Sequence, residues 1–160
     1  MTSDPDRAFL EQFLGQEVDG FVEALDALLR EDEALKRACQ AIIWACALDD
    51  FHVWRTEDAY RCWRDEQVNR DELFGVRYAR DRGLHQFSQL INLSHGWVTP
   101  LFPVVPVTAS YFAWKPSAAL PAPDKKHRDA ERRDCYDKHL AGRPVRFTLI
   151  TVRKLLLGAP

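Results

Sequence analysis

The chain has 160 residues, a formal net charge of −2 and 46% apolar residues, which is typical of a globular domain and unlike a disordered chain. We therefore expect a single domain spanning residues 1–160. No apolar run approaches the roughly 20 residues that a membrane helix needs, and the acidic N-terminus lacks the features of a signal peptide. These observations predict a cytoplasmic protein with no membrane partner.

Charge is distributed unevenly along the chain. Residues 1–75 carry a net charge of −10, whereas residues 124–160 carry +5. An anionic partner is expected to meet the basic C-terminal part, because opposite charges steer association. The acidic part is equally consistent with an ordinary solvated surface.

Helical periodicity dominates the N-terminal half. Apolar residues recur at intervals of three and four, and the predicted helices cover about residues 5–29, 32–48, 56–68 and 72–93. The second is apolar on most sides and is expected to be central. The sequence D-D-F-H-V-W-R is expected to link it to the third, which Thr56 would cap, as Asp71 would cap the fourth.

The amino-acid composition changes after the fourth predicted helix. Six prolines lie between Gly96 and Pro123, and V-V-P-V-T-A-S-Y-F-A-W is rich in β-branched and aromatic residues. We predict a short β-hairpin or extended insertion at about residues 97–120, whose aromatic side chains cover the core and do not stack on bases.

Two more helices follow the insertion. One is predicted from about Asp124 to Ala141, and Gly142 ends it. Pro144 can open the last, in which apolar residues recur at i, i+4, i+7 and i+11: Val145, Leu149, Val152 and Leu156. The sequence therefore predicts an all-α bundle of five or six helices with one non-helical insertion.

One segment concentrates charge within a helical pattern. R-Y-A-R-D-R-G-L-H, residues 77–85, holds three arginines, an aspartate and a histidine. At 100° per residue, Arg77, Asp81 and His85 share one stripe, so Asp81 can touch both of its neighbours. An ionised Asp81 would fix the protonated nitrogen of His85, which is how a general acid or base is commonly oriented. Gly83 lies inside this helix and is expected to allow close approach of another backbone, such as a partner helix.

The segment R-D-R-G-L-H resembles the R-(N/D/H)-x-x-x-H motif of the HEPN ribonucleases. The resemblance covers one motif and a compatible helical fold. It implies a HEPN-like bundle in which two subunits form one cleft that cuts RNA without a metal or cofactor. Arg80 would bind the scissile phosphate, His85 would transfer protons, and Asp81 would orient His85. The family most often has asparagine after the arginine, so Asp81 departs from the commonest form.

Other residues have weaker patterns. R-D-C-Y-D-K-H, residues 133–139, fits a looser form of the same motif, but its charge density indicates an exposed helix face. His52, His95 and His127 are expected at the surface or in loops. Supporting RNA contacts are predicted for the following basic residues: Arg77, Lys125, Lys126, Arg128, Arg132 and Arg133.

The sequence leaves three functions open. The first is a homodimeric endoribonuclease, a toxin or antiviral defence effector that cuts single-stranded RNA and is restrained by an inhibitory protein partner. The second is a non-catalytic helical interaction module, such as an antitoxin or adaptor, in which Arg80 and Asp81 belong to a salt-bridge network at a dimer interface. The third is a small-molecule or nucleotide sensor, which requires a pocket.

Overall fold

The computed structural model describes residues 5–26, 31–83, 89–98, 107–122 and 130–159. Over these residues the chain is mostly helical, with one small antiparallel sheet, as the sequence predicted. The elements in chain order are α1 (Pro5–Asp26), α2 (Glu31–Asp65), α3 (Arg70–Gly83), β1 (Ile91–Val98), β2 (Val107–Trp114), a 3₁₀ turn (Ser117–Ala119), α4 (Ala130–His139) and α5 (Val145–Leu157). None of the described helices is long and apolar enough to cross a membrane.

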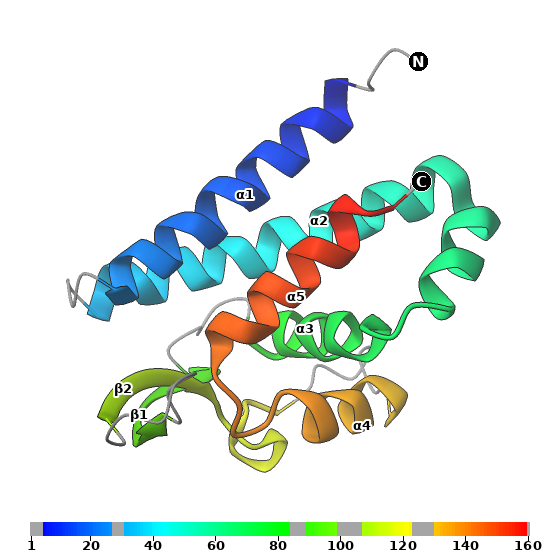
Figure 1. Cartoon of the computed structure of the whole chain (residues 1–160). Coiled ribbons are helices and arrows are strands. Elements are labelled where there is room, and N and C mark those ends of the chain that lie inside the picture. Colours follow the sequence, from blue (N-terminus) through cyan, green and yellow to red (C-terminus); the bar gives the residue numbers. More distant parts are fainter. Residues whose placement is uncertain (1–4, 27–30, 84–88, 99–106, 123–129, 160) are drawn as a thin grey trace.

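Helix α2 forms the centre of the bundle. Figure 1 shows it between α1 and α3, with α5 crossing it, and α4 lying beneath α3. Small side chains on the inner face of α2 let the neighbouring helices approach closely, because Ala38, Ala41 and Ala45 are all fully buried. The prediction of a central second helix is therefore confirmed.

Two predicted helices form a single element in the structure. The expected link at residues 49–55 is helical, and α2 continues through it without a break. The segment contains no glycine or proline that would stop a helix. Thr56 does not cap a new helix, because its hydroxyl donates to the carbonyl of His52 one turn earlier, a common bond within helices.

The next helix is shorter than predicted, and the hairpin begins earlier. Helix α3 ends at Gly83, and Ile91 already begins a strand, so the expected helix to residue 93 is wrong. The predicted hairpin exists, but it begins six residues before the expected boundary. Its strands pair in register from Ile91 opposite Trp114 to Val98 opposite Val107.

The inner end of the hairpin is fixed to the last two helices. Trp114 is 1% exposed, and its indole N–H donates to the hydroxyl of Thr148 in α5 at 3.0 Å. The backbone N–H of Gly142 donates to the carbonyl of Trp114 at 2.8 Å, and Gly142 has a φ of 76° that favours glycine. Trp114 and Phe112 are buried, which confirms for these two side chains that the aromatic segment covers the core.

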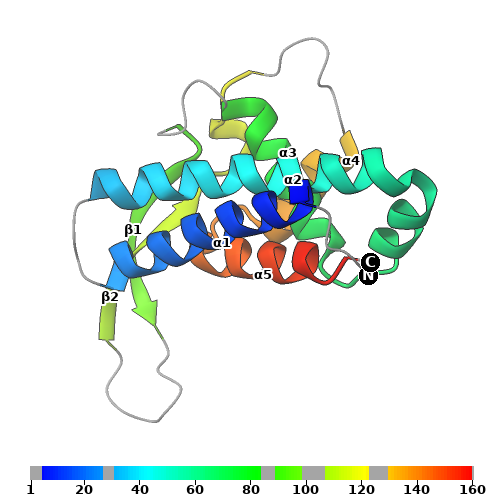
Figure 2. The same cartoon turned by 90° about the horizontal axis from the view of Figure 1, so that it is seen from above.

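The last helix follows its sequence pattern closely. Helix α5 begins after Pro144, and all four residues of its predicted apolar stripe are buried. Figure 2 shows α5 alongside α1, below α2 in that view. Together these helices bury one continuous apolar core.

Candidate functional site

Helix α3 carries the arginines of the predicted motif on the side that faces α2. Its inner face is apolar, because Leu73, Val76 and Ala79 are fully buried. Acidic residues occupy the first turn of α3 and arginines the last, which complements the helix dipole. Arg77 and Arg80 are one turn apart and both reach carboxylates of α2.

One group of side chains forms the buried half of the arginine cluster: Asp49, Tyr60, Arg64 and Arg77. The carboxylate of Asp49 is fully buried and accepts a hydrogen bond from the Tyr60 hydroxyl at 2.7 Å. It also forms ion pairs with Arg77 and, at 3.4 Å, with Arg64. A buried carboxylate needs such partners, because an unpaired buried charge is very costly.

Electrostatics within the buried half hold its groups in one protonation state. Burial alone would lower the pKa of Arg77, but the carboxylates of Asp49 and Asp50 raise it above its ordinary value. Burial and the Asp49 charge both raise the pKa of Tyr60. Arg77 therefore stays cationic and Tyr60 stays neutral, which suits a structural ion pair better than proton transfer.

A second group forms the exposed half of the arginine cluster: Asp50, Arg80, Asp81 and Arg132. Arg80 donates to Asp81 at 3.0 Å and to Asp50 at 3.3 Å. Asp81 also pairs with Arg132 of α4 at 3.4 Å. The Asp50 side chain is 51% exposed, so solvent reaches this half. Arg77 joins the two halves, since it contacts Asp50 at 2.7 Å.

The predicted site residues are brought together only in part. The structure joins four of them in one chain of ion pairs. Arg77 and Arg80 both contact Asp50, and Arg80 and Arg132 both contact Asp81. Four further predicted residues lie outside the described residues: His85, Lys125, Lys126 and Arg128. Arg133 lies away from the arginine cluster, where it pairs with Asp137 at 3.7 Å on the surface of α4.

The weaker arginine–histidine pair is also placed by the structure. Arg133 is exposed, as predicted. His139 instead faces the first turn of α3, with Nε2 3.4 Å from Asp71 and Nδ1 3.9 Å from Glu72. It lines a shallow depression together with Arg143 and Phe147. The two residues of the looser motif thus make separate contacts.

Gly83 has a different neighbour from the one expected. A methyl group at Gly83 would lie 2.4–2.5 Å from three side-chain atoms of Leu90, which is itself fully buried. The close approach is made by the same chain, where it leads into β1. No partner helix is required to explain this glycine.

Sequence reasoning missed the acidic side of the cluster. The sequence pattern predicts a link at Asp49 and Asp50 and a loop or surface position for His52, and both predictions are wrong. His52 is only 3% exposed, and its ring stacks on Tyr60 with centroids 4.9 Å apart. Burial, followed by the charge of Arg7, lowers the pKa of His52, so the ring is neutral at pH 7. Two adjacent aspartates in an otherwise apolar helix were the available signal.

The cysteine nearest the cluster is unreactive. Cys46 is fully buried, and burial raises its pKa to about 12 although Arg80 and Arg77 act in the opposite direction. A thiol in that state is a poor nucleophile. Among the described residues, no group of three or more histidine, cysteine or acidic side chains is arranged to hold a metal.

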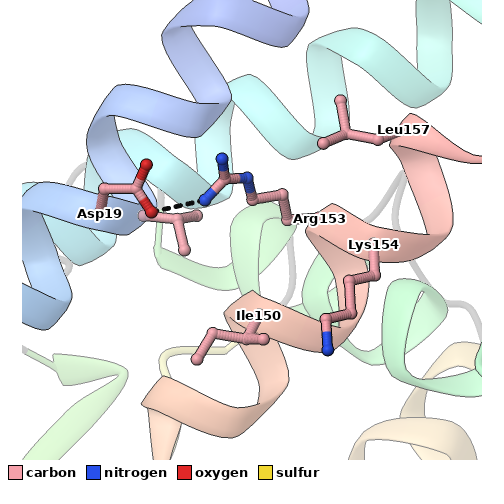
Figure 3. A pocket seen from close by; sticks show the side chains of 6 residues that line it. Asp19, Ile150, Arg153, Lys154 and Leu157 are labelled. Atoms are coloured by element: carbon pink, nitrogen blue, oxygen red, sulfur yellow. Dashed lines mark hydrogen bonds and ion pairs between the residues drawn. The ribbon is translucent and has the colours of Figure 1, made fainter.

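A separate depression lies between α1 and α5. Figure 3 shows Arg153 of α5 reaching Asp19 of α1, with the ion pair at 2.5 Å across the opening. Ile150 and Leu157 line its apolar part. The ion pair joins two helices, and Lys154 is the remaining charged residue among those that line the depression. The arginine cluster is therefore the stronger candidate site.

Comparison with known proteins identified no similar protein. No protein-family model, curated protein or solved structure matches the chain.

Proposed function

We propose that this protein is a metal-independent endoribonuclease of HEPN type, with a HEPN-like bundle and a site shared between two copies. The position of Arg80 is the main support for this proposal. Its guanidinium lies at the solvent-accessible side of the cluster, whereas Arg77, one turn away, is anchored to the buried Asp49. A phosphate can replace the partly exposed Asp50 as a partner of Arg80, because both are oxyanions that arginine binds in the same way.

The chemistry follows from the motif residues. Arg80 binds a non-bridging phosphate oxygen and stabilises the negative charge that builds up during attack. The 2′-hydroxyl attacks the adjacent phosphorus and loses its proton, the bond to the 5′-oxygen breaks, and that oxygen gains a proton. His85 acts in these proton transfers as general base or general acid. Asp81 is a positioning residue that holds Arg80 at 3.0 Å and is proposed to orient His85.

Basic residues on α4 and before it in the sequence extend the proposed RNA surface. Arg132 already reaches Asp81, and Arg133 is exposed one position later on α4. Lys125, Lys126 and Arg128 precede α4 in sequence and are proposed to join them. Contacts of this kind bind the RNA backbone by releasing counterions and make affinity depend on salt. We further propose a cytoplasmic toxin or antiviral defence effector that an inhibitory protein restrains.

One observation favours the second function, a non-catalytic interaction module. Arg80 and Asp81 are satisfied within the chain, where they connect α2, α3 and α4 through ion pairs. An arginine used in this way stabilises a helix surface and requires no substrate. This alternative assigns the cluster to architecture and the activity of the protein to partner binding.

Cleavage of single-stranded RNA in EDTA separates the two functions. Wild-type protein is expected to cut, and Arg80→Ala and His85→Ala are expected to reduce the rate by at least about 100-fold. Arg143→Ala is the matched control, since it removes an exposed arginine outside the proposed RNA surface and should leave most activity. Thermal unfolding of each variant shows whether the fold survives.

The RNA cleavage assay has three outcomes, and each supports a different conclusion. Loss of cutting in the Arg80 and His85 variants alone supports the nuclease. Equal cutting by all variants would show that another site or a contaminant is responsible. Absence of cutting by a correctly folded wild-type dimer would favour the interaction module.

A further inference from the structure

Helix α2 has one face that no described element covers. Helices α1, α5 and α3 occupy the other sides (Figure 1). On the open face Trp54 is 75% exposed and Ile43 is 39% exposed. Phe51 lies between them, half-buried, and Phe9 of α1 adds an exposed ring at the border, 6.1 Å from Trp44. Large apolar side chains gathered in this way are typical of an interaction surface.

The residues of this face are arranged symmetrically in the sequence. We call them the α2 stripe: Lys36, Gln40, Ile43, Ala47, Phe51, Trp54 and Asp58. Measured from Ala47, they lie at positions ±4, ±7 and ±11. At 100° per residue all of them fall within about 80° of one another, and the stripe is about 33 Å long. A symmetric stripe is what a helix needs in order to pair with an antiparallel copy of itself.

We infer that the α2 stripe is the interface with a second copy of this chain, with the two-fold axis passing Ala47. In that arrangement Ile43 of each copy meets Phe51 of the other, and Trp54 meets Gln40, whose side-chain carbonyl can accept the indole N–H. Ala47 meets itself, and its small side chain lets the two helices approach closely.

Charge complementarity supports a second copy as the occupant. Lys36 and Asp58 stand at opposite ends of the stripe, and both are exposed. Neither forms an ion pair with another residue in the described part of the chain. Antiparallel pairing about Ala47 sets Lys36 of one copy against Asp58 of the other, twice per dimer. Parallel pairing would instead set like charges against each other, which disfavours that arrangement.

The inferred axis also has a consequence for the arginine cluster. A two-fold axis perpendicular to two antiparallel helices leaves the elements on one flank of each helix on the same side of the pair. Helix α3 flanks α2 through Asp50, only three residues from Ala47. The exposed halves of both arginine clusters therefore lie on the same side of the dimer, near its axis. The α2 stripe would thus bring the two halves of the nuclease site together, a role that rests on the proposed function.

Dimer dissociation measured by analytical ultracentrifugation tests the interface. Wild-type protein is expected to dimerise at micromolar concentration, and Trp54→Asp is expected to raise the dissociation constant by about 100-fold or more, since each dimer contains two such residues. Phe147→Asp is the matched control, because it also replaces an exposed aromatic residue, on α5, and should leave the constant unchanged.

Charge exchange and cross-linking test the register. Lys36→Glu and Asp58→Lys are each expected to weaken the dimer by about tenfold, and the double exchange is expected to restore it. In a Cys62→Ser background, Ala47→Cys should form a disulfide between copies on mild oxidation, whereas Ala59→Cys should not. Restoration by the double exchange would not follow from a merely structural role of either residue.

The oligomeric state tests the α2 stripe, and the RNA assay separately tests the nuclease. A monomer at all concentrations, or a dimer that Trp54→Asp leaves intact, overturns the α2 interface whatever the RNA assay shows. A dimer that responds as expected but does not cut RNA supports the interface and counts against the nuclease alone.

Discussion

Asp49 and Asp50 are neighbours in α2, and both bind arginines of α3, yet their surroundings are opposite. The Asp49 carboxylate is fully buried among Tyr60, Arg64 and Arg77, whereas that of Asp50 is 51% exposed. The 100° turn between consecutive helical residues directs one inward and the other toward solvent. The comparison indicates that one ion-pair cluster can serve the fold on one side and remain available for binding on the other.

The difference follows from solvation. A buried carboxylate has given up its water, so the fold depends on every partner that replaces that water. An exposed carboxylate exchanges its arginine for water or for another anion at little cost. We therefore expect changes in the buried half to affect stability and changes in the exposed half to affect binding.

The largest expected effect is that of Asp49→Asn. The amide keeps the shape of the side chain and can still accept the Tyr60 hydrogen bond, but it leaves Arg77 and Arg64 without their buried countercharge. The free energy of unfolding should fall by about 3–5 kcal/mol. Urea denaturation followed by circular dichroism measures it. A loss below about 1 kcal/mol would contradict the assignment of this half to the fold.

A pH titration tests the same contrast at His52, which stacks on Tyr60 of the buried half. The pKa of His52 is lowered in the folded protein, so the unfolded chain binds its proton first as pH falls. The stabilising contribution is therefore complete above the unfolded pKa of about 6.5 and is lost as pH falls from there through the folded pKa. The slope from this single group is at most about 1.4 kcal/mol per pH unit.

The control for this titration is His52→Phe, which retains a ring against Tyr60 and removes the titrating group. Stability curves of the two proteins, measured by urea denaturation between pH 5 and 8, should converge in slope above about pH 7 and diverge below pH 6.5. Parallel curves across the whole range would show that His52 is not the group responsible.

The smallest expected effect is that of Asp50→Asn on stability. The free energy of unfolding should change by less than about 1 kcal/mol, and less still in high salt. If Asp50 competes with phosphate for Arg80, the same change should tighten binding of labelled single-stranded RNA by up to about fivefold. Fluorescence anisotropy measures this affinity. Weaker binding than wild type would indicate that Asp50 positions Arg80 and does not compete for it.

Particular elements show what could be predicted from the sequence. The stripe of α5 was predicted correctly because every fourth or third residue is apolar and Pro144 marks the start. The hairpin was predicted from its β-branched and aromatic residues, but its start was misplaced. Ile91, Asn92 and Leu93, the first residues of β1, continue the apolar pattern of the preceding helix. A short apolar run of this kind is compatible with both a helix and a strand.

The error at α2 has a clear physical origin. Asp49, Asp50 and His52 interrupt an apolar pattern, and such polar residues usually mark a surface or a link. The partners of Asp49, Arg64 and Arg77, are 15 and 28 residues away in the chain. No local pattern indicates that a distant arginine will neutralise a buried carboxylate.

Local sequence patterns were sufficient to predict the helical class, the last helix and the hairpin, because these depend mainly on residues close together in the chain. Packing between elements fixed which carboxylates meet the arginines, why Gly83 must be small, and that His52 is buried. Those outcomes depend on side chains from α2, α3 and α4 that share no sequence neighbourhood. Burial and ion pairing act between elements, and they become fixed only when the helices pack.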